Sequence, residues 1–343
     1  MSSRSCIRIV QFVTFIVPFT VWMGCSGGTS GTGGSGGGGG VAGNGGVAGG
    51  GGVAGSGGVA GSGGVAGTGG VAGNGGAGGV EYKLVFEDEF NTGTSPSPAN
   101  WTIETGYGPD GYGWGNNEWQ LYTDLPENVR VEDGNLVLSA QCPEAPCGVR
   151  DGSITSGKIN SLGKFDFKFG KIEARIKPPV GEAAWPAFWS LGVNFPSVGW
   201  PLSGEIDFME MHNFYSDERT THFTMHWCDD SIQAPAPCTH PEGWVYDSQY
   251  LTFDDSLGDD FHLFQAEWDE NKIVGSIDGL VYFTKAIDPA TMEEFLREFY
   301  LILNVAMGGT LGSGDQPPNG TETYPQTMLV DYVRVYQRVD DPN

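Results

Sequence analysis

Basic residues are scarce in this sequence. Of its 343 residues, only 17 are Lys or Arg, whereas 42 are Asp or Glu, and the formal net charge is −25. Residues 1–80 contain two arginines and no acidic residue, so the acidity belongs to the rest of the chain. A domain this acidic repels nucleic acid and anionic membrane surfaces. We therefore expect a neutral partner and no nucleic acid, and sulfated polymers are disfavoured for the same reason.

The sequence also lacks an apolar run as long as a membrane-spanning helix needs, roughly 20 residues. Residues 9–23 are apolar apart from three polar residues, follow two arginines and end just before Cys25. This pattern is typical of an export signal. The junction at Cys25 resembles a lipoprotein cleavage box, although Trp22 stands where leucine is usual. We expect residues 1–25 to be a signal peptide with a lipid on Cys25; simple cleavage, giving a secreted protein, and a retained anchor are the alternatives.

Residues 26–80 contain little that could form a core. They include 31 glycines and a six-residue repeat, Gly-Gly-Val-Ala-Gly plus one variable residue, over positions 39–74. Repeats of six residues also occur in β-helices. Here one Val and one Ala per repeat cannot offset the entropy lost on ordering so much glycine. We expect a flexible linker with an r.m.s. span of roughly 40 Å.

Cysteines are few, and two of the six lie in the N-terminal segment. The other four form two pairs that are close in sequence, and an exported domain permits disulfides. The spacings are not those of a zinc finger or ribbon. We therefore expect two local disulfides, Cys142–Cys147 and Cys228–Cys238.

Helical patterns are also rare from residue 81 onward. One helix is expected, with Asp288 as N-cap, Pro289 in the first turn and residues 291–299 following. The other patterns are those of strands, so residues 81–338 are predicted to form one all-β domain, a sandwich of antiparallel sheets. The strand patterns fall at 135–140, 165–169, 172–176, 261–269, 276–283 with an Asp-Gly hairpin signal, 300–306 and 327–337.

Three carboxylates lie within the strand-like segment 204–212, GEIDFMEMH: Glu205, Asp207 and Glu210. Burying charge on a strand is unfavourable by several kcal/mol unless the charge is paired or used. Residues i and i+2 share a face, so Glu205 and Asp207 point the same way. A β-bulge around 208–209 would bring Glu210 to that face as well. An acidic surface strand is the alternative.

Two glutamates on one face supply the groups of a retaining glycosidase. That mechanism needs the carboxyl groups about 5–5.5 Å apart, so the strand must be curved. Tryptophans cluster at 185 and 189 and at 114 and 119. Sugar rings stack on flat aromatic side chains. Each tryptophan alone is explained equally well by core packing, but beside the carboxylates the group favours a carbohydrate cleft.

Six segments of the chain stand in a characteristic order: LVFEDEFN at 84–91, GWGNNEWQLYT at 113–123, GKIEARIK at 170–177, WPAFW at 185–189, EIDFME at 205–210 and DYVRVY at 331–336. Together they resemble glycoside hydrolase family 16, and within it the laminarinase-like endo-β-1,3-glucanases. The resemblance implies a β-jelly roll of two curved antiparallel sheets with an open substrate groove on the concave face. It also implies catalysis without a cofactor.

The resemblance implies a role for each carboxylate. Glu205 would be the nucleophile and Glu210 the general acid and base, and Asp207 would assist by hydrogen bonding Glu205. Physical chemistry agrees with such a division, because like charges at close range raise one pKa and leave one carboxyl protonated as the acid.

The resemblance further implies a set of residues that bind substrate. Trp185 and Trp189 would line the groove. His226 would lie near Glu210 on a neighbouring strand, with a buried structural histidine as the alternative. Lys158 stands where relatives often have arginine, which puts that contact in doubt. The remaining expected substrate-binding residues are Trp114, Asn116, Glu118 and Gln120.

Some members of the family hold a structural calcium ion on the convex side. The matching positions here are Glu89, the carbonyl of Gly134, and Asp331, and oxygen ligands suit this cation. Solvated surface carboxylates are the alternative.

Three functions remain open at this point. The first is endo-hydrolysis of β-1,3-glucan, or of mixed 1,3-1,4-glucan, by an exported monomer. The second keeps the fold and mechanism but acts on agarose, carrageenan or xyloglucan. The third is a non-catalytic glucan-binding protein, which the presence of all three carboxylates disfavours.

Overall fold

The computed structural model describes residues 80–339 apart from 110, 145–146, 148–149, 213, 230–237, 239–242 and 319. The expected signal peptide and all but the last residue of the expected linker therefore lie outside the described residues. Within the described part of the chain, every helix is too short or too polar to cross a membrane.

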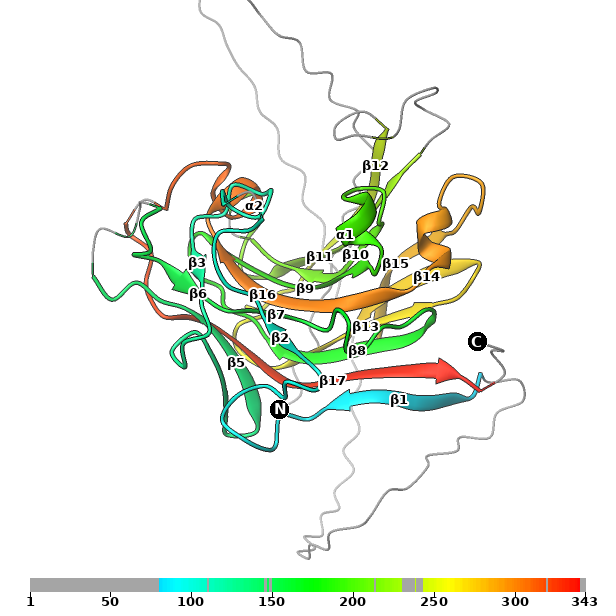
Figure 1. Ribbon diagram of the computed structural model, residues 1–343, viewed down its shortest axis with the longest axis horizontal. Coiled ribbons are helices and arrows are strands. Elements are labelled where there is room, and N and C mark those ends of the chain that lie inside the picture. The colour runs from blue at the N-terminus through cyan, green and yellow to red at the C-terminus, as the bar shows by residue number, and fades with distance from the viewer. Residues whose placement is uncertain are drawn as a thin grey trace, which may run out of the picture. The chain divides into compact units, whose positions relative to one another are not determined.

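Two large antiparallel sheets stack as curved layers (Figure 1). The all-β sandwich predicted from the strand patterns is thus confirmed. The first sheet runs in spatial order through β15 (Leu280–Ala286), β14 (Lys272–Ile277), β13 (His262–Trp268), β8 (Gly170–Lys177), β17 (Gln326–Arg338), β5 (Asn135–Ala140) and β4 (Val129–Glu132), with β1 (Tyr82–Asp88) also paired to β17.

The second sheet carries the functional residues. It runs through β12 (Trp244–Thr252), β11 (Thr220–Cys228), β10 (Glu205–Glu210), β9 (Ala184–Gly192), β16 (Phe299–Met307), β7 (Lys158–Asn160) and β2 (Thr102–Ile103). A short parallel pair, β3 (Leu121–Tyr122) and β6 (Thr155–Ser156), lies apart from both sheets in the pairing order.

The main core lies between the two sheets. Alternate residues of neighbouring strands, such as Ile206 and Phe208 on β10 and Phe223 and Met225 on β11, are almost fully buried there. Each large side chain buried in this way contributes roughly 1.5–3 kcal/mol. The residues that alternate with them along the strands, including Glu205, therefore point to the other face of the second sheet.

Strand β16 is buried along its whole length, as its continuous apolar sequence predicted. One side joins the main core through Leu301 and Leu303. The other side contributes Tyr300 and Ile302 to a smaller apolar cluster with Leu191 of β9. The second sheet thus has an apolar patch on its outer face as well, beside the carboxylates.

The hairpin signal in 276–283 is confirmed. Asp278 and Gly279 connect β14 to β15 with φ angles of 51° and 78°. Positive φ at both central residues is the signature of the type I′ turn, whose twist matches the flanking strands.

The expected helix over 291–299 is wrong. Residues Glu293–Leu296 form a single 3₁₀ turn, η1, and Phe299 already belongs to β16, where it pairs with Gly192 of β9. Asp288 instead closes a turn, because its carbonyl accepts hydrogen bonds from the Met292 and Thr291 amides. Sheet pairing has overridden the local helical pattern. Two short helices, α1 (Phe195–Val198) and α2 (Gly309–Ser313), were not predicted.

The alternating phenylalanines of 165–169 do not form a strand of either sheet. Phe167 makes only an isolated bridge to Phe299. Its ring packs edge-on against Trp268, while Phe165 stacks on Phe86. The alternation therefore reflects core packing rather than a ladder of hydrogen bonds.

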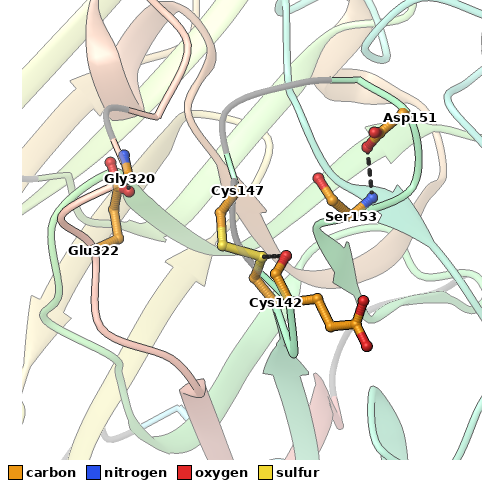
Figure 2. The surroundings of a disulfide bond; sticks show 7 residues. Cys142, Cys147, Asp151, Ser153, Gly320 and Glu322 are labelled. Carbon is orange, nitrogen blue, oxygen red and sulfur yellow. Dashed lines mark hydrogen bonds between the residues drawn. A yellow bond between two sulfur atoms is a disulfide. The ribbon is translucent and has the colours of Figure 1, made fainter.

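Both predicted disulfides are present. Cys142–Cys147, shown in Figure 2, and Cys228–Cys238 span Cα–Cα distances of 6.0 and 5.9 Å. The first lies near a turn in which the Ser153 amide donates to Asp151 Oδ1 at 2.9 Å (Figure 2).

Glu294 is a buried carboxylate of η1. Its Oε1 accepts a hydrogen bond from the Cys228 amide at 3.1 Å, and its Oε2 has no hydrogen-bond partner among the described residues. Burial raises the pKa of Glu294 from 4.5 to about 7. Folding therefore favours the protonated form, and this contribution to stability is complete below pH 4.5 and is lost as the pH rises to about 7.

We expect Glu294→Gln to remove this pH dependence. Because glutamine cannot ionise, the variant should be more stable than the parent protein at pH 8, by up to about 3 kcal/mol, and nearly equal to it at pH 4.5. Urea denaturation at the two pH values measures the difference. An equal effect of the substitution at both pH values would contradict the account.

Candidate active site

The predicted bulge in β10 is confirmed. The register shifts between Asp207 and Glu210 against β11, and between Asp207 and Met209 against β9. Phe208 and Met209 both join the core, and the extra residue turns Glu210 to the same face as Glu205 and Asp207. The three carboxylates of the motif therefore share one face.

Glu205, Asp207 and His226 form a tight group. One carboxylate oxygen of each acidic residue and one ring nitrogen of the histidine all lie within 4.8 Å of one another. His226 Nε2 is 3.3 Å from Asp207 Oδ2 and 3.7 Å from Glu205 Oε1. Asp207 is only 1% exposed and hydrogen bonds Glu205, whose side chain is 16% exposed. Of the two, Glu205 is thus the one that a substrate can reach.

Glu210 has its own partners. Its Oε2 lies 2.9 Å from Nε2 of His222, and its Oε1 accepts a hydrogen bond from the Trp185 indole at 2.7 Å. His222 is the β11 residue paired with Glu210, and its ring stacks on Tyr250 of β12. Both oxygens of the carboxyl group are thereby oriented.

The pKa values of the three carboxyls move apart. Burial, followed by the charge of Asp207, raises the pKa of Glu205 well above its usual value. Burial and the charge of Glu210 do the same for Asp207. Burial also acts to raise the pKa of Glu210, but the charge and hydrogen bond of His222 and the hydrogen bond of Trp185 outweigh it and lower this pKa to about 2.

This order reverses the expected one for the free protein. The pKa of Glu210, expected to be the protonated acid, is lowered, whereas the pKa values of Glu205 and Asp207 are raised. The expectation considered only repulsion among carboxylates. It did not include His222, whose charge and hydrogen bond lower the pKa of Glu210.

His226 lies on a neighbouring strand, β11, as expected. There it pairs with Glu205 and contacts Asp207, and its charge acts to lower the pKa of Glu210. The histidine that binds Glu210 is His222, which the sequence analysis missed. The spacing contained the signal, since 222 and 226 differ by an even number and share a face of β11, where Glu210 meets the earlier residue.

Two of the predicted tryptophans lie at the carboxylates' face. Trp185 is 8% exposed and binds Glu210, so it serves to orient the carboxyl group. Trp189 is half-buried, and its indole N–H donates to Asn304 Oδ1 at 2.7 Å. Trp189 packs against the outer apolar cluster, of which Leu191 is the register partner of Glu205. An apolar platform therefore adjoins the first carboxylate.

Glu118 and Gln120, predicted to contact sugar hydroxyls, are both buried and hydrogen-bonded within the protein. Gln120 is fully buried, and its amide oxygen accepts a hydrogen bond from the Met307 amide. Glu118 is 5% exposed and accepts hydrogen bonds from Asn116, Gln120 and Tyr122 at 3.2, 2.6 and 3.1 Å. Burial raises the pKa of Glu118, and these contacts and Lys158 oppose the rise.

The buried Glu118 instead supports Trp189 through a chain of hydrogen bonds. Tyr122 donates to Glu118, Asn304 donates to the Tyr122 hydroxyl at 3.1 Å, and Trp189 donates to Asn304. Asn116, which is half-buried, remains a predicted substrate contact.

Lys158 connects the two groups of tryptophans. Its Nζ lies 4.0 Å from the centre of the Trp114 ring and 5.3 Å from that of Trp189, and it forms an ion pair with Glu104 at 3.2 Å. A cation over an aromatic face is attracted by the ring quadrupole. Lysine therefore orients Trp114 and Trp189 here, and Trp114 remains a predicted substrate contact.

The expected calcium ligands do not fit a metal site. Both oxygens of Glu89 are bound by Arg334 at 2.7 and 3.0 Å, and Asp331 is paired with Arg175 at 2.7 Å. Oxygen donors that already neutralise arginines are poor ligands for a hard cation. The carbonyl of Gly134 alone does not make a site.

Two glutamates with a buried aspartate between them, on the outer face of an antiparallel sandwich and beside tryptophans, define a glycoside hydrolase of the two-carboxylate type. The sequence places the chain more narrowly. Residues 116–333 match the model of glycosyl hydrolases family 16, and the chain belongs to this family.

Relatives agree with this placement. The chain is 34% identical to glucan endo-1,3-beta-glucosidase A1 of Niallia circulans over 273 residues, which is 74% of this chain but only 38% of that protein. It is 32% identical to the beta-glucanase of Rhodothermus marinus over 279 residues, 76% of this chain and 86% of that one. The chain thus spans about two fifths of the longer relative and most of the shorter one.

Among solved structures, the laminarinase catalytic domain of Thermotoga maritima superposes with a TM-score of 0.63 and 36% identity. The match covers 76% of this chain and all of that domain. The fold is therefore the β-jelly roll of the family, as the resemblance implied.

Proposed function

We propose that this protein is a retaining glycosidase that hydrolyses internal β-1,3-linkages of a neutral β-glucan. One observation carries the proposal. The bulge in β10 brings Glu205 and Glu210 to one face, and each has a different set of partners. The names of the Niallia circulans and Thermotoga maritima relatives, an endo-1,3-glucosidase and a laminarinase, support the choice of glucan.

The proposed reaction is a double displacement. The carboxylate of Glu205 attacks the anomeric carbon while the glycosidic C–O bond breaks, and Glu210 gives a proton to the departing oxygen. Glu210 then takes a proton from water, whose oxygen attacks the same carbon and releases Glu205. The configuration is retained because the carbon is inverted twice.

Protons must be in the right places for this reaction. In the free protein, burial raises the pKa values of Glu205 and Asp207, whereas for Glu210 the charge and hydrogen bond of His222 outweigh burial and lower the pKa. The reaction needs the opposite assignment, with Glu205 ionised and Glu210 protonated. We propose that substrate favours this change by removing water from around the carboxyl groups.

The location of the protein is part of the proposal. The signal-like residues 1–25 and the glycine-rich residues 26–80 support export and attachment to the cell surface through a linker. The acidic domain supports a neutral polymer as substrate, such as laminarin or mixed-linkage glucan.

A panel of polymers tests the function. The purified protein should release reducing ends from laminarin, with oligosaccharides of several lengths appearing early, as internal cleavage requires. Activity on agarose, carrageenan or xyloglucan alone would move the proposal to another polysaccharide. Binding to laminarin without release of reducing ends would make the protein a glucan-binding protein.

The contacts of His222 with Glu210 lead to a prediction. Burial acts to raise the pKa of Glu210, and the charge and hydrogen bond of His222 lower it. We expect His222→Gln to shift the alkaline limb of the pH profile of kcat/KM to higher pH, because burial then raises the pKa of the general acid with less opposition. Unchanged folding is checked by the melting temperature, and an alkaline limb at the same pH as in the parent protein would refute the role of His222.

A further inference from the structure

Trp244 begins β12 and faces His226 diagonally across the β11–β12 pair. The register places Trp244 opposite Cys228 and Tyr246 opposite His226. Diagonal neighbours of an antiparallel pair share a face and are within reach of large side chains. The Trp244 indole Nε1 lies 3.1 Å from Nδ1 of His226, and the two rings are stacked, with centroids 5.7 Å apart and an interplanar angle of 20°.

The chemistry of the indole fixes the role of each imidazole nitrogen. An indole N–H can only donate, so Nδ1 of His226 accepts and carries no proton. The proton of the neutral ring is then on Nε2, which faces Asp207 and Glu205 at 3.3 and 3.7 Å. The opposite tautomer would set N–H against N–H on one side and a lone pair against a carboxylate on the other.

Asp207 depends on this proton. Its Oδ2 is buried and accepts no hydrogen bond of normal geometry among the described residues. A buried carboxylate oxygen without a donor is unfavourable. An Nε2–H at 3.3 Å supplies the favourable dipole, and it can tighten into a hydrogen bond when substrate expels water.

We propose that Trp244 is a positioning residue of the glycosidase site. It holds His226 in the Nε2–H tautomer and thereby orients Asp207, which in turn orients the nucleophile Glu205. This inference rests on the proposed function for its effect on activity, but the tautomer itself is independent of that function. In histidines generally, the hydrogen bond of one ring nitrogen determines whether the other nitrogen carries the proton.

Two further features hold Trp244 in place. Trp200 packs against the rings of Trp244 and His226. The centroid of its own ring lies 5.3 Å from that of Trp244 and 5.8 Å from that of His226. The disulfide of Cys228, the register partner of Trp244, joins this end of β11 to Cys238. The Trp244–His226 pair therefore has the Trp200 ring on one side and a disulfide-linked strand end on the other.

The test is Trp244→Phe, which keeps a stacked ring and removes only the N–H donor. We expect kcat on laminarin to fall about threefold to tenfold, the range of one hydrogen bond, with KM little changed. Long-range ¹H–¹⁵N spectra of ring-labelled histidine should show His226 protonated on Nε2 in the parent protein and as a mixture of tautomers in the variant. Tyr246→Phe is the matched control, since the Tyr246 ring stacks on Trp244 and lies 5.9 Å from that of His226, and the substitution keeps this ring and removes only its hydroxyl.

Several outcomes would overturn the proposal. His226 protonated on Nδ1 in the parent protein would do so without any variant, even where Trp244→Phe failed to fold. A variant with raised KM, unchanged kcat and an unchanged tautomer would make Trp244 a sugar-stacking residue only. The predicted tautomer in a protein that hydrolyses no glucan would instead count against the proposed function and leave the assignment of His226 standing.

Discussion

Replacing Glu205 by glutamine is expected to abolish the release of reducing ends from laminarin. The amide has nearly the shape of the carboxylate but cannot attack the anomeric carbon, so no glycosyl-enzyme forms. We expect kcat to fall by more than about 10⁴-fold, equivalent to about 5.5 kcal/mol of transition-state stabilisation. A reducing-sugar assay at saturating laminarin measures the loss. The substitution also removes a carboxyl group of raised pKa, so the variant should be at least as stable as the parent protein.

A matched control separates this effect from a general loss of negative charge. Glu132 is an exposed glutamate of β4, on the other sheet, and it forms an ion pair with Arg130 at the surface. Glu132→Gln should retain full activity. A Glu205→Gln variant that folds and keeps more than about a hundredth of the parent rate would show that Glu205 is not the nucleophile.

Replacing Glu210 by glutamine is expected to have an effect that depends on the leaving group. General acid catalysis contributes about 10²- to 10⁴-fold, and this should be the loss of kcat/KM on laminarin. An aryl glycoside whose phenol has a low pKa needs no proton to depart. With such a substrate the first step should survive the substitution, and the glycosyl-enzyme should accumulate because no base activates water.

The leaving-group comparison has a clear contrary result. An equal loss on laminarin and on the activated aryl glycoside would mean that Glu210 does not protonate the departing oxygen. Its hydrogen bonds to His222 and Trp185 would then be structural.

The sequence contained enough to predict the centre of the site. Parity along a strand required a bulge between Asp207 and Glu210, because three carboxylates on one face were the only arrangement that used them all. The hairpin at Asp278 and Gly279 and the buried strand β16 were predictable for similar local reasons. In each case a short stretch of sequence favours one backbone conformation, so the local structure can be predicted without knowledge of distant residues.

Other features depended on neighbours that are distant in sequence. The helix expected after Asp288 lost to pairing of Phe299 with β9, which no local pattern reveals. The motif around Glu118 predicts a sugar contact. In the fold, Glu118 is buried and bound by Tyr122, which is in turn bound by Asn304. His222 was missed because its role depends on a register between β10 and β11 that the bulge itself shifts.

Azide rescue tests the assignment of the two glutamates most directly. Glu205→Ala and Glu210→Ala are each incubated with an activated aryl β-laminaribioside and sodium azide. The anomeric configuration of the glycosyl azide product is determined by ¹H NMR. If Glu205 is the nucleophile, azide replaces it in a single inversion and the product is the α-azide. If Glu210 is the acid and base, azide attacks the glycosyl-enzyme and the product is the β-azide. The same anomer from both variants, or the two anomers exchanged, would contradict the account.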